Sequence, residues 1–338
     1  MSETSMELRS RISTGIDFNA EGVQHGNLTI PWSRNDSAWG SVLMPISVFK
    51  RGDGPTVLLT GGSHGDEYEG PIALMNLIRS LDIAAISGRV IIIPALNYPA
   101  VKAGTRLSPI DGRNMNRTFP GNGSGTVTEM IADFVQRFIL PLCDAVVDIH
   151  AGGKMMSFLP CSVIHALPDE AQMARTVAAA KAFGAPHCLV LQELDAAGML
   201  DTAVEETGKI FVSTELGGGG TATVETVRIA YNGVHDVLAH LGALDAAPRG
   251  NGETQFLETP DGAFIIADRG GLFEAAVEPG DAIEAGDILA YIHDIDNPTA
   301  APAVYRAKLG GIVMHRHVAG QIARGDCLAV IAQPSEVR

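Results

Sequence analysis

Between about residues 55 and 245, short apolar runs alternate with longer segments whose apolar residues recur at helical spacing. The short runs predict strands at 57–60, 90–93, 145–149, 189–191 and 210–213. The longer segments predict helices over 71–81, 126–138, 168–183 and 223–241. Strands that alternate with helices of this length are typical of an α/β fold, with helices on both faces of a largely parallel sheet.

The regions on either side of this alternation favour strands alone. Before residue 50, two candidate strands are bounded by glycine and proline, which predicts a β extension of the sheet. After about residue 248, short strands are separated by glycines, and the pattern of 270–290 recurs over 310–329. Such a repeat predicts a small β-sandwich or barrel. We therefore expect a main domain over 1–248, with 1–50 as its β extension, and an all-β domain over 249–338.

The net charge of −15, with no basic stretch, argues against nucleic-acid binding, because neutralising phosphates needs clustered Lys and Arg. An acidic surface modestly favours a cationic ligand. No basic and apolar leader opens the chain, and no apolar run approaches the length of a membrane span, so we expect neither a signal peptide nor a membrane protein. The four cysteines lack C-x-x-C spacing, which indicates free thiols in the cytoplasm. The sequence is compatible with a homo-oligomer.

Two of the predicted strands end in side chains that zinc prefers. The loop after 57–60 carries His64 and Glu67, and the strand 145–149 ends at His150. Ligands bind at the carboxyl ends of the strands in open α/β sheets, and a catalytic zinc ion needs only three protein ligands. Asp148 lies on the same strand face as His150, where a carboxylate can orient the imidazole. The pattern predicts a zinc site with one open position.

A third strand end supplies a carboxylate for proton transfer. Glu215 follows the apolar run 210–213 and precedes four glycines at 217–220, which leave room for a substrate. An open position on zinc holds a water molecule whose pKa falls to about 7. A carboxylate near that water can take its proton and pass it to a leaving amine. Glu215 is therefore the candidate general base.

The loop between 104 and 121 is rich in arginine and asparagine. Arg106, Arg113, Asn116 and Arg117 lie within this short span. Guanidinium groups bind carboxylates through paired, charge-assisted hydrogen bonds. The loop is a candidate clamp for a substrate carboxylate, although an ordinary surface loop would have the same composition.

Four motifs of this chain resemble those of the succinylglutamate desuccinylase/aspartoacylase family. In chain order they are H-x-x-E, N-x-N-R-x-F-P-G, D-I-H and E-L-G-G-G. The resemblance extends over roughly 50–338. It implies a zinc hydrolase with one zinc ion per chain. The implied fold is a zinc-carboxypeptidase-like mixed sheet with helices on both faces, followed by a small C-terminal all-β domain.

The resemblance also implies roles for particular residues. The implied zinc ligands are His64, Glu67 and His150, and the implied base is Glu215. Asn116 and Arg117 correspond to residues that hold the substrate α-carboxylate. Arg106 corresponds to the arginine that polarises the scissile carbonyl, with Arg113 as its rival because the spacing differs. The family's D-L-N-R is replaced here by Asn114-Met-Asn-Arg, which leaves the role of Asn114 open.

Within the family, the wording of these motifs is most similar to the subgroup that deacetylates N-α-acetyl-L-2,4-diaminobutyrate during ectoine degradation. That small N-acyl amino acid carries a free amine, which agrees with the acidic charge of the chain. Candidate acids for contacting the amine are Glu69, Glu193 and Asp195. Other substrates of the family, those of aspartoacylases, desuccinylases or carboxypeptidases, remain alternatives.

Three unrelated interpretations are weaker. Gly61-x-Ser63-x-Gly65 also matches the nucleophile elbow of serine hydrolases, with Asp148 and His235 downstream as partners. A binding protein without catalysis would leave Glu215 without a role. The C-terminal repeat resembles biotinyl and lipoyl carrier domains, but Lys308 lacks the motif to which those cofactors attach.

Overall fold

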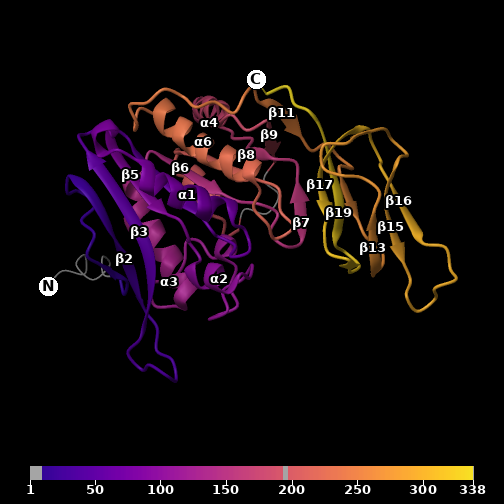
Figure 1. The fold of residues 1–338 in the computed structure, drawn as a ribbon, viewed down its shortest axis with the longest axis horizontal. Coiled ribbons are helices and arrows are strands. Elements are labelled where there is room, and N and C mark those ends of the chain that lie inside the picture. Colours follow the sequence, from indigo (N-terminus) through magenta and orange to yellow (C-terminus); the bar gives the residue numbers. More distant parts are fainter. Residues whose placement is uncertain (1–9, 193–196, 338) are drawn as a thin grey trace.

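The computed structural model describes residues 10–192 and 197–337. Figure 1 shows an elongated molecule, in which a large body of helices and strands carries a group of strands at one end. Within the described residues, no helix is both long enough and apolar enough to cross a membrane.

The large sheet is mixed and follows the order β1-β2-β3-β5-β4-β6-β10-β8-β9-β11-β19-β17-β14. Its first strands are β1 (Ser13–Thr14), β2 (Gly22–Pro31) and β3 (Ser41–Arg51). Its central strands are β4 (Thr56–Gly61), β5 (Gly88–Ile93), β6 (Ala145–Ile149), β8 (Cys161–His165), β9 (His187–Leu191) and β10 (Ile210–Glu215). The strands predicted between 55 and 245 are all present, whereas β8 was not predicted. Because β8 runs antiparallel to β10, the sheet is less parallel than the sequence indicated.

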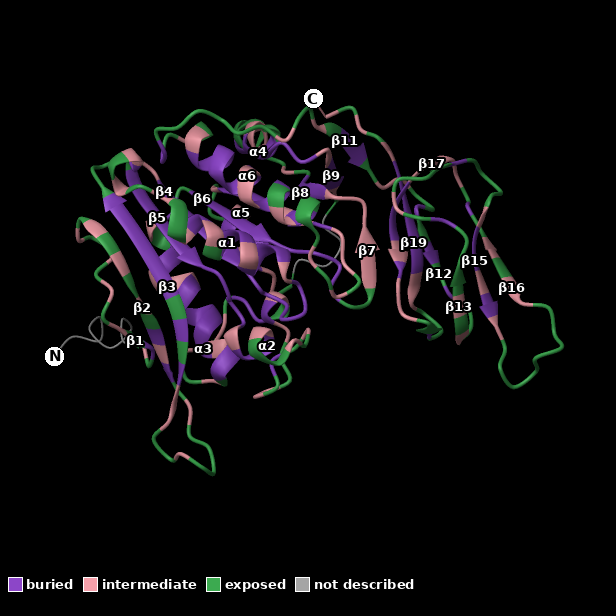
Figure 2. Cartoon of the chain, viewed as in Figure 1, coloured by how far each residue is buried: buried purple, intermediate pink, exposed green. Residues whose placement is uncertain are grey.

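Helices cover both faces of this sheet. They are α1 (Glu69–Ser80), α2 (Tyr98–Ala103), α3 (Val127–Phe134), α4 (Glu170–Phe183), α5 (Leu200–Glu205) and α6 (Val224–His240). Alternate residues of β4 enter different cores: Val57 and Leu59 pack with α1, α4 and α6, and Leu58 packs with α3 and α5. Figure 2 shows the central strands buried between these layers. The α/β architecture with helices on both faces is confirmed.

The register of the central strands brings three loops together. Thr60 of β4 lies opposite Asp148 of β6, and Ser213 of β10 lies opposite the same residue from the other side. The three strands are parallel, so the segments that follow them emerge at one edge of the sheet. The loop after β4, His150 after β6 and the end of β10 are therefore neighbours.

Among the described residues after 254, the regular elements are strands joined by turns and loops, without a helix. Those strands are β11 (Gln255–Glu258), β12 (Phe264–Ile266), β13 (Gly271–Ala275), β14 (Ala282–Ile283), β15 (Ile288–His293), β16 (Ala303–Arg306), β17 (Gly311–His317), β18 (Gln321–Ile322) and β19 (Cys327–Pro334). One set continues the large sheet through the β9–β11 and β11–β19 pairs, and the other forms a sheet of four strands. In addition, β7 (Met156–Phe158) from the body pairs with β17.

Candidate active site

The loop after β4 is shaped by close backbone packing. Gly62 has φ +67°, a conformation that side chains other than glycine rarely adopt. At Gly65, a Cβ atom would lie 2.0 Å from the carbonyl carbon of Ala100 in α2, so only glycine fits there. The amide of Gly65 also donates to the carbonyl of Thr105 over 3.0 Å. This packing fixes the loop so that His64 and Glu67 turn towards the end of β6.

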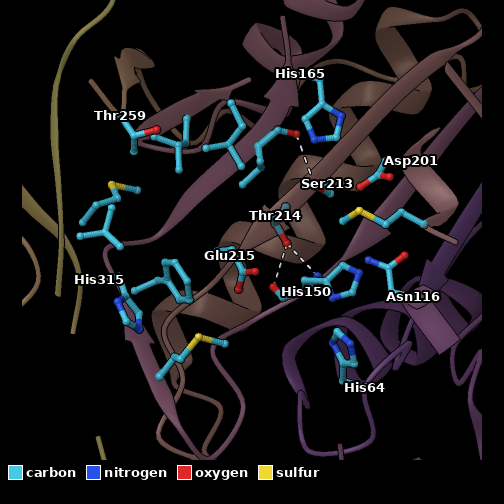
Figure 3. Close-up of a pocket in the computed structure, with 18 of the residues that line it drawn as sticks. His64, Asn116, His150, His165, Asp201, Ser213, Thr214, Glu215, Thr259 and His315 are labelled. Carbon is cyan, nitrogen blue, oxygen red and sulfur yellow. Dashed lines mark hydrogen bonds between the residues drawn. The ribbon is translucent and has the colours of Figure 1, made fainter. Parts of the chain in front are cut away.

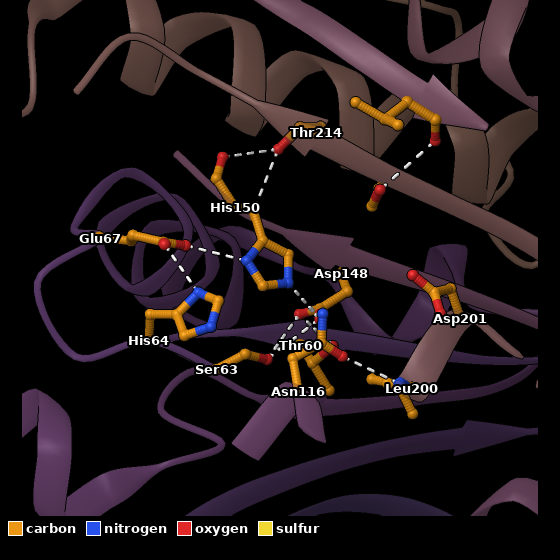
Figure 4. A network of polar contacts seen from close by, with 12 residues as sticks. Thr60, Ser63, His64, Glu67, Asn116, Asp148, His150, Leu200, Asp201 and Thr214 are labelled. Carbon is orange, nitrogen blue, oxygen red and sulfur yellow. Dashed lines mark hydrogen bonds and ion pairs between the residues drawn. The ribbon is translucent and has the colours of Figure 1, made fainter. Parts of the chain in front are cut away.

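Three buried side chains, His64, Glu67 and His150, converge at this point (Figure 4). The Nδ1 atom of His64 lies 2.7 Å from Oε1 of Glu67, and the Nδ1 atom of His150 lies 2.9 Å from Oε2. One potential ligand atom from each residue lies within 4.8 Å of the other two. The group has the donors and the spacing to hold a metal ion, and two imidazoles with one carboxylate suit zinc.

The opposite nitrogen of each imidazole has its own acceptor. Nε2 of His150 lies 2.8 Å from Asp148, and Nε2 of His64 lies 3.0 Å from Oδ1 of Asn114. The hydroxyls of Thr60 and Ser63 donate to the Asp148 carboxylate, over 2.7 Å and 3.0 Å. These bonds orient both rings so that their Nδ1 atoms face Glu67. The position of Asp148 beside His150 agrees with its place on the same strand face in the sequence, whereas no sequence pattern predicted that Asn114 would contact His64.

The carboxylate of Glu67 and the imidazole of His150 shift each other's pKa values. Burial alone would raise the pKa of Glu67, but His150 and His64 hold it well below its usual range. Burial alone would lower the pKa of His150, but Asp148 and Glu67 raise it well above its usual value. Glu67 is therefore ionised, as a metal ligand must be.

Glu215 stands beside this group at the end of β10. Burial, followed by the charge of Glu67, raises the pKa of Glu215 to about 8. Its Oε2 atom is buried and has no hydrogen-bond partner among residues 10–192 and 197–337. A carboxyl with an unused oxygen and a pKa near neutrality can accept a proton and release it again.

A cavity of about 350 Å³ opens onto these residues (Figure 3). Arg106, Asn116 and Arg117 line it, and Nη1 of Arg106 lies 3.3 Å from Oε1 of Glu67. Oδ1 of Asn116 accepts from the amide of Leu200 over 2.9 Å, which fixes that side chain against α5. By contrast, Arg113 pairs with Glu129 over 2.8 Å and does not line the cavity. The geometry favours Arg106 over Arg113 for contact with a substrate.

The cavity also contains polar residues that sequence analysis missed. Asp201, at the start of α5, lines it on the side of Asn116 (Figure 3). Of the acids proposed to contact an amine, Glu69 is buried outside the cavity, with its carboxylate near Thr226. Glu193 and Asp195 lie outside the described residues. Asp201 had no motif to mark it, because a lone acid at a helix start is common.

The residues of the alternative serine site are not assembled. The Ser63 hydroxyl donates to Asp148 and does not line the cavity. Nδ1 of His235 lies 2.8 Å from Asp236 on the same helix, and His235 is also absent from the cavity wall. Ser63 therefore supports the orientation of His150, and within residues 10–192 and 197–337 its hydroxyl is bonded to Asp148 and to no histidine.

Comparison with known families agrees with this geometry. Residues 53–241 match the succinylglutamate desuccinylase/aspartoacylase catalytic domain. The chain belongs to this family. The predicted family membership is thus confirmed, and the proteins named in these comparisons are amide hydrolases.

Three relatives extend the similarity over nearly the whole chain. The N-α-acetyl-L-2,4-diaminobutyric acid deacetylase of Halomonas elongata is 46% identical over 97% of this chain and 96% of its own length. A product-bound structure of the ectoine utilization protein EutE (DoeB) from Ruegeria pomeroyi has a TM-score of 0.94, at 48% identity over 96% of this chain and 99% of that one. A succinylglutamate desuccinylase structure from Silicibacter has a TM-score of 0.93, at 45% identity over 97% and 99%.

Proposed function

We propose that this family member is a zinc-dependent deacylase that removes the acetyl group from N-α-acetyl-L-2,4-diaminobutyrate. One observation carries the proposal: a single cavity joins the His64–Glu67–His150 group, the carboxyl of Glu215, a cationic wall and an acid. The cationic wall is Arg106 and Arg117, and the acid is Asp201. The substrate has the matching parts, which are an amide, a carboxylate and an ammonium group. The deacetylase relative supports the choice of substrate.

His64, Glu67 and His150 would hold one zinc ion. The donor set fits, because both Nδ1 atoms face an ionised carboxylate while both Nε2 atoms are bonded elsewhere. A bound zinc ion would supply Lewis-acid activation of water near neutral pH.

The protein side chains would bind the substrate, stabilise the charge on its carbonyl oxygen and transfer the proton. Asn116 and Arg117 hold the α-carboxylate of the substrate, and Asp201 holds its side-chain ammonium. Arg106 donates to the scissile carbonyl oxygen and stabilises the negative charge that develops there. Glu215 takes a proton from the attacking water and delivers it to the α-nitrogen as the carbon–nitrogen bond breaks. The products are acetate and 2,4-diaminobutyrate.

Family membership also supports proposals for the fold plan, the domains, the partners and the location of the protein. The body would have the zinc-carboxypeptidase plan, with a catalytic domain over 1–248 and a C-terminal β domain over 249–338. The partner is a small acyl amino acid, with no nucleic acid and no membrane involved, and a homo-oligomer is compatible with this function. Three of the four cysteines are buried and all four are free thiols, which agrees with a cytoplasmic enzyme.

A panel of N-acyl amino acids tests the substrate. Purified protein would be assayed with and without added zinc against the acetyl derivative of 2,4-diaminobutyrate, acetyl-aspartate and succinyl-glutamate. We expect zinc-dependent hydrolysis of the first substrate, with kcat/KM at least about 100-fold above the other two, because Asp201 meets a cation in one case and a carboxylate in the others. Preference for acetyl-aspartate or succinyl-glutamate would instead assign the alternative family activity.

A further inference from the structure

The cavity extends beyond Glu215 to a wall built by the C-terminal strands. Five residues of this wall come from β12, β17 and β19, namely Phe264, Met314, His315, Cys327 and Val330. Figure 3 shows His315 and Thr259 on one side of Glu215, with Asn116, Asp201 and His165 on the other. The cavity therefore has two ends, with the proposed reaction centre between them.

His315 is fixed at its end of the cavity by the strand pair that joins the two parts of the chain. In the antiparallel pairing of β7 and β17, His315 lies opposite Phe158. The two rings are 4.9 Å apart between centroids and tilted by 47°. The His315 side chain is only 2% exposed, so it is held in place and is not a surface group.

Both ring nitrogens of His315 lack a hydrogen-bond partner among the described residues. Burial, together with the nearby charges of His317 and Arg316, lowers the pKa of His315 to about 4. The ring is therefore neutral near pH 7 and offers one N–H donor and one acceptor nitrogen. Buried polar groups without partners are rare and costly in native proteins, which indicates that a ligand group completes this site.

The orientation of the bound substrate determines which of its groups reaches His315. This orientation is inferred from the proposed function. Asn116, Arg117 and Asp201 would take the amino-acid part, so the acyl part points past Glu215 towards His315. An acetyl group extends only one methyl group beyond the scissile carbonyl, so it leaves this end of the cavity unfilled. The rest of the cavity at this end would hold a longer acyl chain.

We infer that His315 is a specificity-determining residue that hydrogen-bonds a polar group at the far end of the substrate's acyl chain. The enzyme accordingly has a second activity, the hydrolysis of N-acyl amino acids whose acyl groups are longer than acetyl and end in a hydroxyl. Met314 and Val330 contact the carbon chain, and the neutral imidazole selects against an apolar end that would leave its nitrogens unpaired.

The test uses pairs of N2-acyl derivatives of 2,4-diaminobutyrate. In each pair, one acyl group ends in a hydroxyl and its isostere ends in a methyl, over several chain lengths. For at least one length, the wild-type protein is expected to show a hydroxyl-over-methyl ratio of kcat/KM of about ten. The ratio should fall to about one in His315→Phe, which keeps a ring against Phe158, and should partly return in His315→Gln.

His317→Phe is the matched control, because His317 is a buried histidine on the same strand that does not line the cavity. Its ratio should equal that of the wild type. A wild-type ratio near one at every length, or an unchanged ratio in His315→Phe, overturns the inference. If the acetyl substrate is hydrolysed but no hydroxyl preference is found, the proposed function stands and the inference about His315 fails. If no derivative is hydrolysed, the proposed function and the inference both fail.

Discussion

The Nε2 atom of His64 lies 3.0 Å from Oδ1 of Asn114, and this oxygen also accepts the amide of Asn116 over 2.9 Å. One side chain therefore orients a proposed zinc ligand and the start of the carboxylate clamp.

Asn114→Ala should weaken zinc binding by about 10- to 100-fold, as expected when the partner of a ligating histidine is lost. Competition with a chromogenic chelator measures this change. Asn114→Asp keeps an acceptor oxygen and should bind zinc more tightly than Asn114→Ala. Equal affinities in the two variants would remove Asn114 from this role.

Glu215→Gln tests proton transfer. The substitution keeps the shape of the side chain but removes its ability to accept a proton. We expect kcat to fall by at least about 100-fold while the zinc content stays near that of the wild type. Steady-state kinetics and metal analysis of the same sample give both values. Glu253→Gln, at an exposed position, is the control and should leave both unchanged. Near-normal turnover in Glu215→Gln would contradict the assignment.

Asp201→Asn tests recognition of the side-chain amine. A hydrogen bond to a charged group contributes about 1.5–3 kcal/mol, so KM for the acetyl-diaminobutyrate substrate should rise by about 10- to 100-fold. Acetyl-2-aminobutyrate has the same backbone without the amine, and its KM should change much less. A parallel change for both substrates would indicate that Asp201 acts through the fold of α5 and not through the ammonium group.

Metal removal distinguishes the two hydrolytic mechanisms. Dialysis against a chelator should abolish activity, and added zinc should restore it. Ser63→Ala removes one hydrogen bond to Asp148, so we expect a loss of no more than about 10-fold. A serine nucleophile would produce the reverse pattern, with activity that survives the chelator and is lost in the variant.

Stability below pH 6.5 should depend on His315. Its pKa is about 4 in the folded protein against 6.5 for the ordinary group, because of burial and the charges of His317 and Arg316. The unfolded chain therefore takes up the proton first as the pH falls. The resulting stability is fully present above pH 6.5 and is lost as the pH falls towards about 4. His315→Phe should reduce the loss between pH 7 and pH 5 by about 1–2 kcal/mol, measured by urea unfolding at both values. An equal loss in both proteins would show that the ring does not titrate in this way.

Much of the site could be predicted from the sequence because its residues are tied to strand ends. His150 and Glu215 each follow a run of apolar residues, and His64 and Glu67 lie in a glycine-rich loop after another. Parallel strands bring such ends together whatever lies between them in the sequence. Local pattern and sheet geometry therefore sufficed to predict that His64, Glu67, His150 and Glu215 lie close together, while their roles stay predictions.

The missed features depend on pairing between distant segments. The strand β8 contains Ser162 and His165, which interrupt its apolar pattern and hid it. Asp201 and His315 reach the cavity only because α5 and β17 pack against its walls, and neither residue belongs to a motif. The acceptor of His64 was missed for the same reason, since Asn114 lies 50 residues further along the chain. Long-range packing of this kind leaves no periodic trace in a single sequence.

The ladder of main-chain hydrogen bonds that runs from β9 through β11 to β19 also limits how this enzyme can be divided. A chain cut near residue 248 would leave β9 with a row of unpaired backbone groups, which is a template for aggregation. It would also lose Met314, His315 and Val330 from the cavity wall. The C-terminal strands are thus not a removable module, and a change of acyl preference by exchanging them between relatives must preserve the backbone pairing of β11.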